Sequence, residues 1–235
     1  MLAAIFYLLS RYEEYLPHQK DMYGRYAHKN ALAFQNDFLN QPLVNTWLEH
    51  FKRTIKQKNS QFSPARGGLN KIGLHPSWQS NDQLLLIEKE KNRLENIASK
   101  KVSASRQHYI RLSLPQTYRQ LIQAGINNDY SMGYGSINGF RASITTSFYW
   151  YDLDKEEQTS LLIHPFCFMD ANAFFEQKLT AEQAFNEMLS YYKTIKNVNG
   201  QMITIWHNTF LGTDRMFKGW REAYEKFIEI VSSSY

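Results

Sequence analysis

Cysteine is nearly missing from this chain of 235 residues. Its single cysteine, Cys167, excludes an internal disulfide and any zinc or iron–sulfur site built from several cysteines. Long apolar runs are missing as well, since the apolar start at residues 1–9 is far shorter than the about 20 residues of a membrane span. That start has no basic residue and no evident cleavage site, so it does not resemble a signal peptide. We therefore expect a protein without a transmembrane segment, located in the cytoplasm.

A strong excess of one charge is also lacking. Lys and Arg number 27 against 22 Asp and Glu, and the resulting net charge of +5 is spread along the chain. This excess is too small and too dispersed to indicate a nucleic-acid partner. Hydrophobic residues make up 43% of the chain and charged residues 21%, which predicts a sizeable core rather than general disorder. The length allows one large α/β domain, or a smaller one with an appended subdomain.

Several signatures of common enzymes are absent from the sequence. It contains no G-x-S-x-G nucleophile elbow, no phosphate-binding Walker loop and no dinucleotide-binding glycine pattern. It also has no H-E-x-x-H or C-x-x-C metal motif. The glycines at 131–140 do not have the spacing of a phosphate-binding loop, and we interpret this run as a flexible loop at an active site.

Aromatic residues are abundant, at 15% of the chain. Amphipathic rings at that density suit a groove for flat, hydroxylated ligands such as sugars. An aromatic-rich core is the simpler interpretation, and composition alone favours it.

Strand and helix patterns alternate after residue 68. The strand-like segments are 71–74, 102–105, 126–131, 143–151, 161–168 and 201–206, and the helical ones are 81–100, 115–124, 180–195 and 215–231. Capping boxes are predicted at Ser80 with Gln83 and at Thr180 with Gln183. The alternation predicts parallel βαβ units, hence a barrel or a doubly wound sheet. The loop-like segment 63–68 separates a helical or irregular part, 1–62, from the α/β part, 63–235.

Polar side chains follow the predicted strands. His75 and His207 come directly after 71–74 and 201–206, while Arg106 with His108 and Asp129 occupy the ends of the next elements. In parallel α/β folds, functional residues gather at the C-terminal ends of strands, so these side chains are expected to meet at one mouth. His164, between apolar residues, is expected to be a hydrogen-bonded core histidine, and the acidic residues at 152–157 a solvated turn.

Five segments carry a family resemblance: 6–17, 21–34, 72–78 (IGLHPSW), 105–143 (beginning SRQHYIRLSLP) and 203–208 (ITIWHN). Together they resemble polysaccharide deacetylase-like proteins of a type found in Bacteroidetes, relatives of the NodB-homology carbohydrate esterases. The resemblance implies a distorted (β/α) barrel in which a divalent metal, usually zinc, activates water to hydrolyse an N- or O-acetyl group on a polysaccharide or oligosaccharide. A metal suits this chemistry because it polarises the carbonyl and lowers the pKa of bound water to about 7.

The same resemblance implies roles for individual residues. His75 matches a metal ligand, and His108 a second ligand or a substrate contact. Arg106 matches an arginine that orients the catalytic carboxylate, and His207 the histidine that protonates the leaving amine. Asp129 corresponds to an acidic residue that holds this last histidine. Two aromatic residues beside these positions, Trp78 and Tyr130, are the expected substrate contacts.

Departures from the family pattern leave two interpretations open. The family's barrel begins with a strand ending in paired aspartates, and none precede His75. The second histidine of its His-x-x-x-His motif is replaced by Gln79. The resemblance therefore predicts a shortened, distorted or incomplete barrel that is either a deacetylase or a non-catalytic carbohydrate-binding or cell-envelope assembly protein derived from one. Exposed strand edges of an incomplete barrel would favour association into a homo-oligomer.

Overall fold

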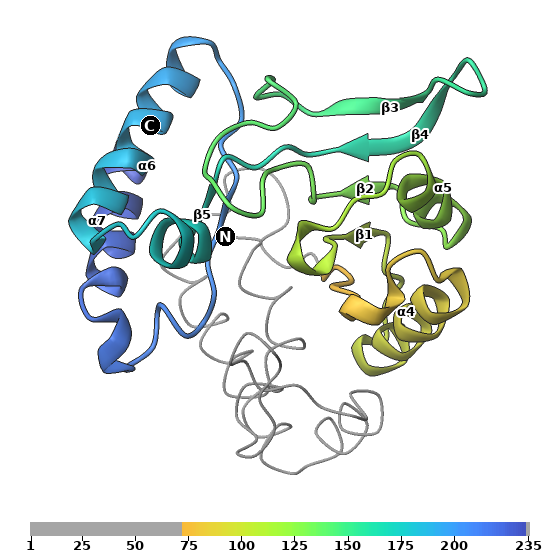
Figure 1. Cartoon of the computed structure of the whole chain (residues 1–235), viewed down its shortest axis with the longest axis horizontal. Coiled ribbons are helices and arrows are strands. Elements are labelled where there is room, and N and C mark those ends of the chain that lie inside the picture. The colour runs from red at the N-terminus through yellow and green to blue at the C-terminus, as the bar shows by residue number, and fades with distance from the viewer. Residues whose placement is uncertain (1–71, 234–235) are drawn as a thin grey trace. The chain divides into compact units, whose positions relative to one another are not determined.

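The computed structural model describes residues 72–233, which belong to the predicted α/β part of the chain. These residues form a mixed α/β structure with two separate sheets (Figure 1). The predicted segment 1–62 and its boundary near residue 63 lie outside the described residues.

The larger sheet has four strands in the order β1-β2-β4-β3. The strands are β1 (Ala104–Ser105), β2 (Asn128–Asp129), β3 (Phe148–Asp152) and β4 (Glu157–Ile163). β1, β2 and β4 are parallel, and β3 pairs antiparallel with β4. Leu74 adds a parallel bridge to Ser105, which is all that the described residues form of the strand predicted at 71–74.

The smaller sheet pairs β5 (Phe168–Met169) in parallel with β6 (Thr204–Ile205). The sequence predicted one strand over 161–168, but β4 ends at Ile163 because Pro165 has no N–H to donate to a ladder. The chain then crosses to the second sheet, guided by a hydrogen bond from the Phe166 N–H to the Met132 carbonyl, 3.1 Å. Within residues 72–233 the strands form no closed barrel.

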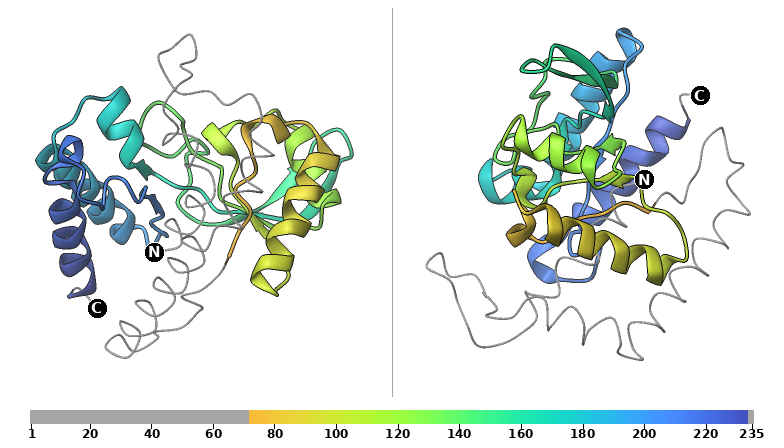
Figure 2. Two further views of the ribbon diagram at one scale, coloured as in Figure 1. Left: turned by 90° about the horizontal axis from the view of Figure 1, so that it is seen from below. Right: turned by 90° about the vertical axis from the view of Figure 1, so that its right-hand side faces the viewer.

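The helices lie in two groups. The described helices are η2 (Trp78–Ser80), α4 (Leu84–Ala98), η3 (His108–Ile110), α5 (Gln116–Gln123), the π-helix η4 (Asn172–Glu176), α6 (Ala181–Asn197), η5 (Arg215–Phe217) and α7 (Trp220–Ser232). In Figures 1 and 2, α4 and α5 lie near each other at one side, and α6 and α7 pack together at the other. None of the helices in this part of the chain is long and apolar enough to cross a membrane.

One predicted capping box is confirmed and the other is wrong. At the start of α6 the Gln183 N–H donates to Thr180 Oγ1 at 3.2 Å, and the Thr180 N–H donates to Gln183 Oε1 at 2.8 Å. Before α4, Ser80 instead donates its hydroxyl to the Ser77 carbonyl at 2.6 Å, and α4 begins later, at Leu84. Asp82, which has a left-handed backbone conformation (φ 61°), separates Ser80 from α4, so the Ser80 side chain cannot cap this helix.

Aromatic residues build the larger core, as composition favoured. It lies between α6, α7 and the second sheet, and its largest members are Phe168, Phe185, Trp206, Phe210, Phe217, Trp220 and Phe227. The helix predicted over 215–231 divides into η5 and α7 because Gly219 adopts a left-handed conformation (φ 88°).

β3 differs from the buried strand predicted at 143–151. It begins only at Phe148 and lies at the edge of the sheet, with Tyr149 51% and Tyr151 44% exposed. Its run of aromatic residues, SFYWYD, resembles a core strand, but only alternate side chains turn inward. Whether copies of the chain associate through such edges stays a prediction.

Candidate functional site

The predicted site residues follow the C-terminal ends of neighbouring strands. His75 follows the Leu74 bridge, Arg106 follows β1, and Asp129 is the last residue of β2. His207 comes two residues after β6, in the second sheet. The pKa of His75 is lowered by burial first and then by the charge of His108; the hydrogen bond to the Arg106 carbonyl opposes this, and the charges of Arg106 and His207 lower the pKa further. The strand ends therefore bring residues of both sheets within electrostatic range of one another.

His75 and His108 form a stacked pair. Their ring centroids are 4.8 Å apart and their planes differ by 16°. His75 Nδ1 lies 2.7 Å from the Arg106 carbonyl oxygen, so this nitrogen carries the proton and donates it. The lowered pKa keeps the ring neutral at pH 7, which leaves Nε2 as an electron-pair donor.

Arg106 and Asp129 are both buried, 2% and 0% exposed, and lie close enough for each to shift the pKa of the other. Arg106 donates from Nε to the Tyr130 carbonyl at 3.1 Å, and burial lowers its pKa to about 10, so it stays charged at neutral pH. Asp129 accepts hydrogen bonds from the Ser105 hydroxyl (2.9 Å) and from the Ser131 N–H (2.9 Å) and hydroxyl (2.8 Å). Burial raises the pKa of Asp129, while these bonds and Arg106 oppose the increase.

The carboxylate that holds His207 is Asp170, not Asp129 as the resemblance implied. Asp170 is completely buried at the end of β5, where a short helical turn leads into η4. It accepts hydrogen bonds from both the backbone N–H and the ring Nδ1 of His207. Asp170 binds Nδ1 and so fixes the orientation of the His207 ring, which leaves Nε2 for proton transfer. Carboxylates orient histidine acids and bases in enzymes in the same way.

His164 is hydrogen-bonded at both ring nitrogens, as expected for a satisfied histidine. It lies just after β4 rather than inside a strand, with Nδ1 2.7 Å from the Ser147 hydroxyl and Nε2 2.8 Å from Asn128 Oδ1. Its ring stacks on Tyr130 at 4.4 Å, with planes 8° apart. Tyr130, a predicted substrate contact, is itself only 5% exposed, so its ring packs inside the protein against His164.

Two exposed aromatic rings lie close in sequence to the histidine pair, in η2 and η3. Trp78, a predicted substrate contact, is 46% exposed in η2. Tyr109 is 60% exposed and meets the His108 ring edge to face at 4.4 Å. Tyr109 and Ile110 both have positive φ (54° and 55°), which is costly for side chains of this size and is found preferentially at functional sites.

The glycine-containing segment 131–140 contacts η4 and α6. Asn172 donates to the carbonyls of Tyr134 and Ile137 at 3.0 and 2.9 Å, and Asn138 donates to Glu187 at 2.7 Å. Gly133 packs so closely that an added Cβ would lie 2.2 Å from the Phe166 ring. These contacts hold the segment against η4 and α6, and its flexibility stays a prediction.

The described residues do not by themselves fit a zinc centre. A catalytic zinc takes three protein ligands, whereas His75 and His108 offer two imidazoles. Within residues 72–233 no group of three His, Cys, Asp or Glu side chains is arranged to hold a metal ion. The proton on His75 Nδ1 does match the tautomer of metal-binding histidines, whose second nitrogen donates to a carbonyl or carboxylate.

Comparison with known proteins assigns no function to the described residues. The model of a family described as "Family of unknown function (DUF7033)" matches residues 1–60, outside the described part. No curated protein matches the chain. Among solved structures, a candidate polysaccharide deacetylase from Mycobacterium smegmatis is 16% identical, with a TM-score of 0.47 over 68% of this chain. The match spans 56% of that protein, and at this level of similarity it assigns no activity.

Proposed function

We propose that the chain hydrolyses acetyl groups on a carbohydrate, with His207 as the proton donor to the leaving group. The observation that carries the proposal is the buried Asp170–His207 pair at the strand ends that also present His75 and His108. An imidazole whose orientation is fixed by a buried carboxylate suits proton transfer in the hydrolysis of a polar substrate. The family resemblance supplies the substrate class.

In the proposed reaction, the oxygen of water bonds to the acetyl carbonyl carbon and the C–N or C–O bond to the sugar breaks. His207 Nε2 takes the proton that the attacking water releases, and then gives that proton to the departing nitrogen or oxygen. Asp170 stabilises the protonated ring before this transfer and keeps its orientation. Arg106 stays charged at neutral pH, because burial lowers its pKa only to about 10, and its charge lies within electrostatic range of His75.

The experiment is hydrolysis of N-acetylglucosamine oligosaccharides, followed by release of acetate, with the full chain and its His207→Ala variant. Loss of the proton donor should lower kcat by about 10²–10⁴-fold. The expected product of the wild type is one free amine for each acetate released. Binding of the oligosaccharide without any acetate release would instead support the non-catalytic carbohydrate-binding alternative.

We further propose that His75, together with His108, binds a divalent metal, zinc according to the family resemblance. Zinc would polarise the acetyl carbonyl and acidify a water molecule. Elemental analysis of protein purified without chelator should give near-stoichiometric zinc that is lost in His75→Ala. A matched control is His164→Ala, because His164 is hydrogen-bonded at both nitrogens. Equal zinc in wild type and His75→Ala would contradict the assignment.

A further inference from the structure

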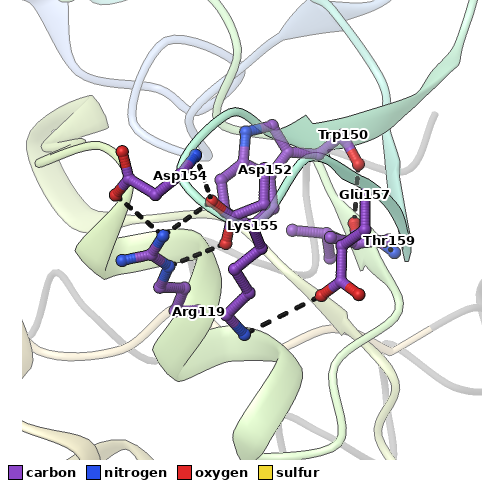
Figure 3. Close-up of polar contacts among 8 residues, drawn as sticks. Arg119, Trp150, Asp152, Asp154, Lys155, Glu157 and Thr159 are labelled. Atoms are coloured by element: carbon purple, nitrogen blue, oxygen red, sulfur yellow. Dashed lines mark hydrogen bonds and ion pairs between the residues drawn. The ribbon is translucent and has the colours of Figure 1, made fainter.

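A surface cavity of about 310 Å³ lies between α5 and the β3–β4 hairpin, away from the strand ends just described (Figure 3). Its lining residues are Arg119, Ile122, Trp150, Asp152, Lys155, Glu157, Gln158, Thr159 and Ser160. Small-molecule sites span about 300–1,000 Å³, so this one matches a single small ring rather than an extended ligand.

One wall of the cavity is aromatic. Trp150 is half-buried, and its indole meets the Tyr118 ring edge to face, with centroids 5.4 Å apart. The Thr159 hydroxyl donates to the Trp150 carbonyl at 2.8 Å, which ties β4 to β3 beside the indole. An indole held in place can stack on the apolar face of a sugar ring without losing side-chain freedom on binding.

The charges around the cavity are paired with one another. Arg119 contacts Asp152 through Nε at 2.7 Å and Nη2 at 2.6 Å, and Nη2 also contacts Asp154 at 2.9 Å (Figure 3). Lys155 Nζ lies 3.8 Å from Glu157. The predicted solvated turn is thus partly wrong, because Asp152 is 1% exposed and its pKa is lowered by the hydrogen bonds from Arg119.

These pairs determine which ligand the cavity suits. Two cations and two carboxylates line it, so an anionic sugar or a phosphate would gain no net attraction. The charged side chains still have lone pairs and N–H groups to offer a ligand. Thr159, Gln158 and Ser160 add further hydrogen-bond donors and acceptors around the indole. A ligand with neutral hydroxyl groups suits a cavity whose polar lining has balanced charges.

We propose that this cavity binds one neutral pyranose unit of a glycan chain. It lies where β4 begins, whereas the candidate active site lies where β4 ends, and seven residues of strand span roughly 20 Å. A polymer held at both places would bind more tightly than a short fragment, because the second contact is intramolecular. The link to a polymeric substrate rests on the proposed deacetylase function, whereas binding of the sugar unit itself does not.

The test is binding of N-acetylglucosamine and its pentamer to the full chain, followed through tryptophan indole NMR signals without any hydrolysis readout. Trp150→Ala should weaken binding of the pentamer by about tenfold, the usual loss on truncating an aromatic anchor. The matched control is Tyr149→Ala, on the opposite face of the same strand, which should leave affinity unchanged. A second variant combines Lys155→Ala with Glu157→Ala. Both side chains line the cavity, so their loss should weaken binding. They are 56% and 58% exposed, so the fold should not be disturbed.

The outcomes separate the two proposals. Pentamer binding that depends on Trp150, with no acetate released, supports the cavity and contradicts the deacetylase. If the chain releases acetate, and Trp150→Ala is as active and binds the pentamer as tightly as wild type, the cavity proposal alone is overturned. Equal affinity of the wild type for the pentamer and for a galacturonic acid pentamer would also overturn it, because the balanced charges should not hold an anionic sugar.

Discussion

At the scale of single residues, Asp170 matters most for the proposed chemistry. Asp170→Asn should lower acetate release by about 10²–10⁴-fold, because a neutral amide cannot stabilise the protonated His207 ring and can impose the wrong tautomer. Asp214→Asn is the matched control, since Asp214 is exposed and only caps η5. The measurement is kcat on the oligosaccharide, with thermal melts to show that both variants fold. Full activity in Asp170→Asn would remove His207 from the mechanism.

Sequence reasoning proposed several residues of the candidate site but missed Asp170. His75, Arg106 and His207 were found because each follows an apolar strand-like segment, and strand ends of a parallel sheet meet. Asp170 was hidden because 161–168 was interpreted as one strand. Pro165 was the available signal: it divides the segment, and Asp170 then follows a second short strand in the same way as the other site residues. The pairing of His207 with Asp170 rather than Asp129 depends on tertiary packing that no local pattern encodes.

At the scale of secondary-structure elements, the α6 capping box gives a clean prediction. Thr180→Ala should lower the free energy of unfolding by about 1 kcal/mol, because the Gln183 N–H loses its acceptor. Thr180→Ser keeps the hydroxyl and should restore most of the stability. Urea unfolding of the three proteins measures the difference. An alanine variant as stable as the serine variant would mean that the box contributes nothing.

The contrast between the two predicted capping boxes shows what local sequence can decide. Both have the required residue types at the required spacing. Only the one at Thr180 forms, because Ser80 is fully buried and bonded to Ser77, while Asp82 turns the chain before α4. The exposure of Tyr149 and Tyr151 likewise follows from β3 being at the edge of the sheet. Such positions are set by sheet order, which composition and periodicity do not reveal.

At the scale of the whole molecule, the acid sensitivity of folding has an identifiable contributor. Hydrogen bonds from the Val102 N–H and from Lys91 lower the pKa of Glu95 from 4.5 to about 2. Because its folded pKa is depressed, the stabilisation is complete above pH 4.5 and is lost as the pH falls toward 2. Glu95→Gln should therefore be less stable than wild type at pH 7, with the difference shrinking between pH 4.5 and 2.

Urea midpoints of wild type and Glu95→Gln at pH 7, 4 and 3 measure this convergence. Glu88→Gln serves as the control, since Glu88 lies on the same helix and forms no hydrogen bond or ion pair with the described residues. A wild type whose stability exceeds that of Glu95→Gln by the same amount at every pH would contradict the assignment.

The candidate site draws its histidines from two sheets that have separate hydrogen-bond ladders, with His75 and His108 on one side and His207 on the other. The two sheets are joined by the extended stretch that leaves β4 and enters β5. Amide hydrogens in the two ladders can therefore exchange with solvent through separate local openings. A substrate that touches both sides would couple those openings, so its binding would register as slower exchange in both sheets at once.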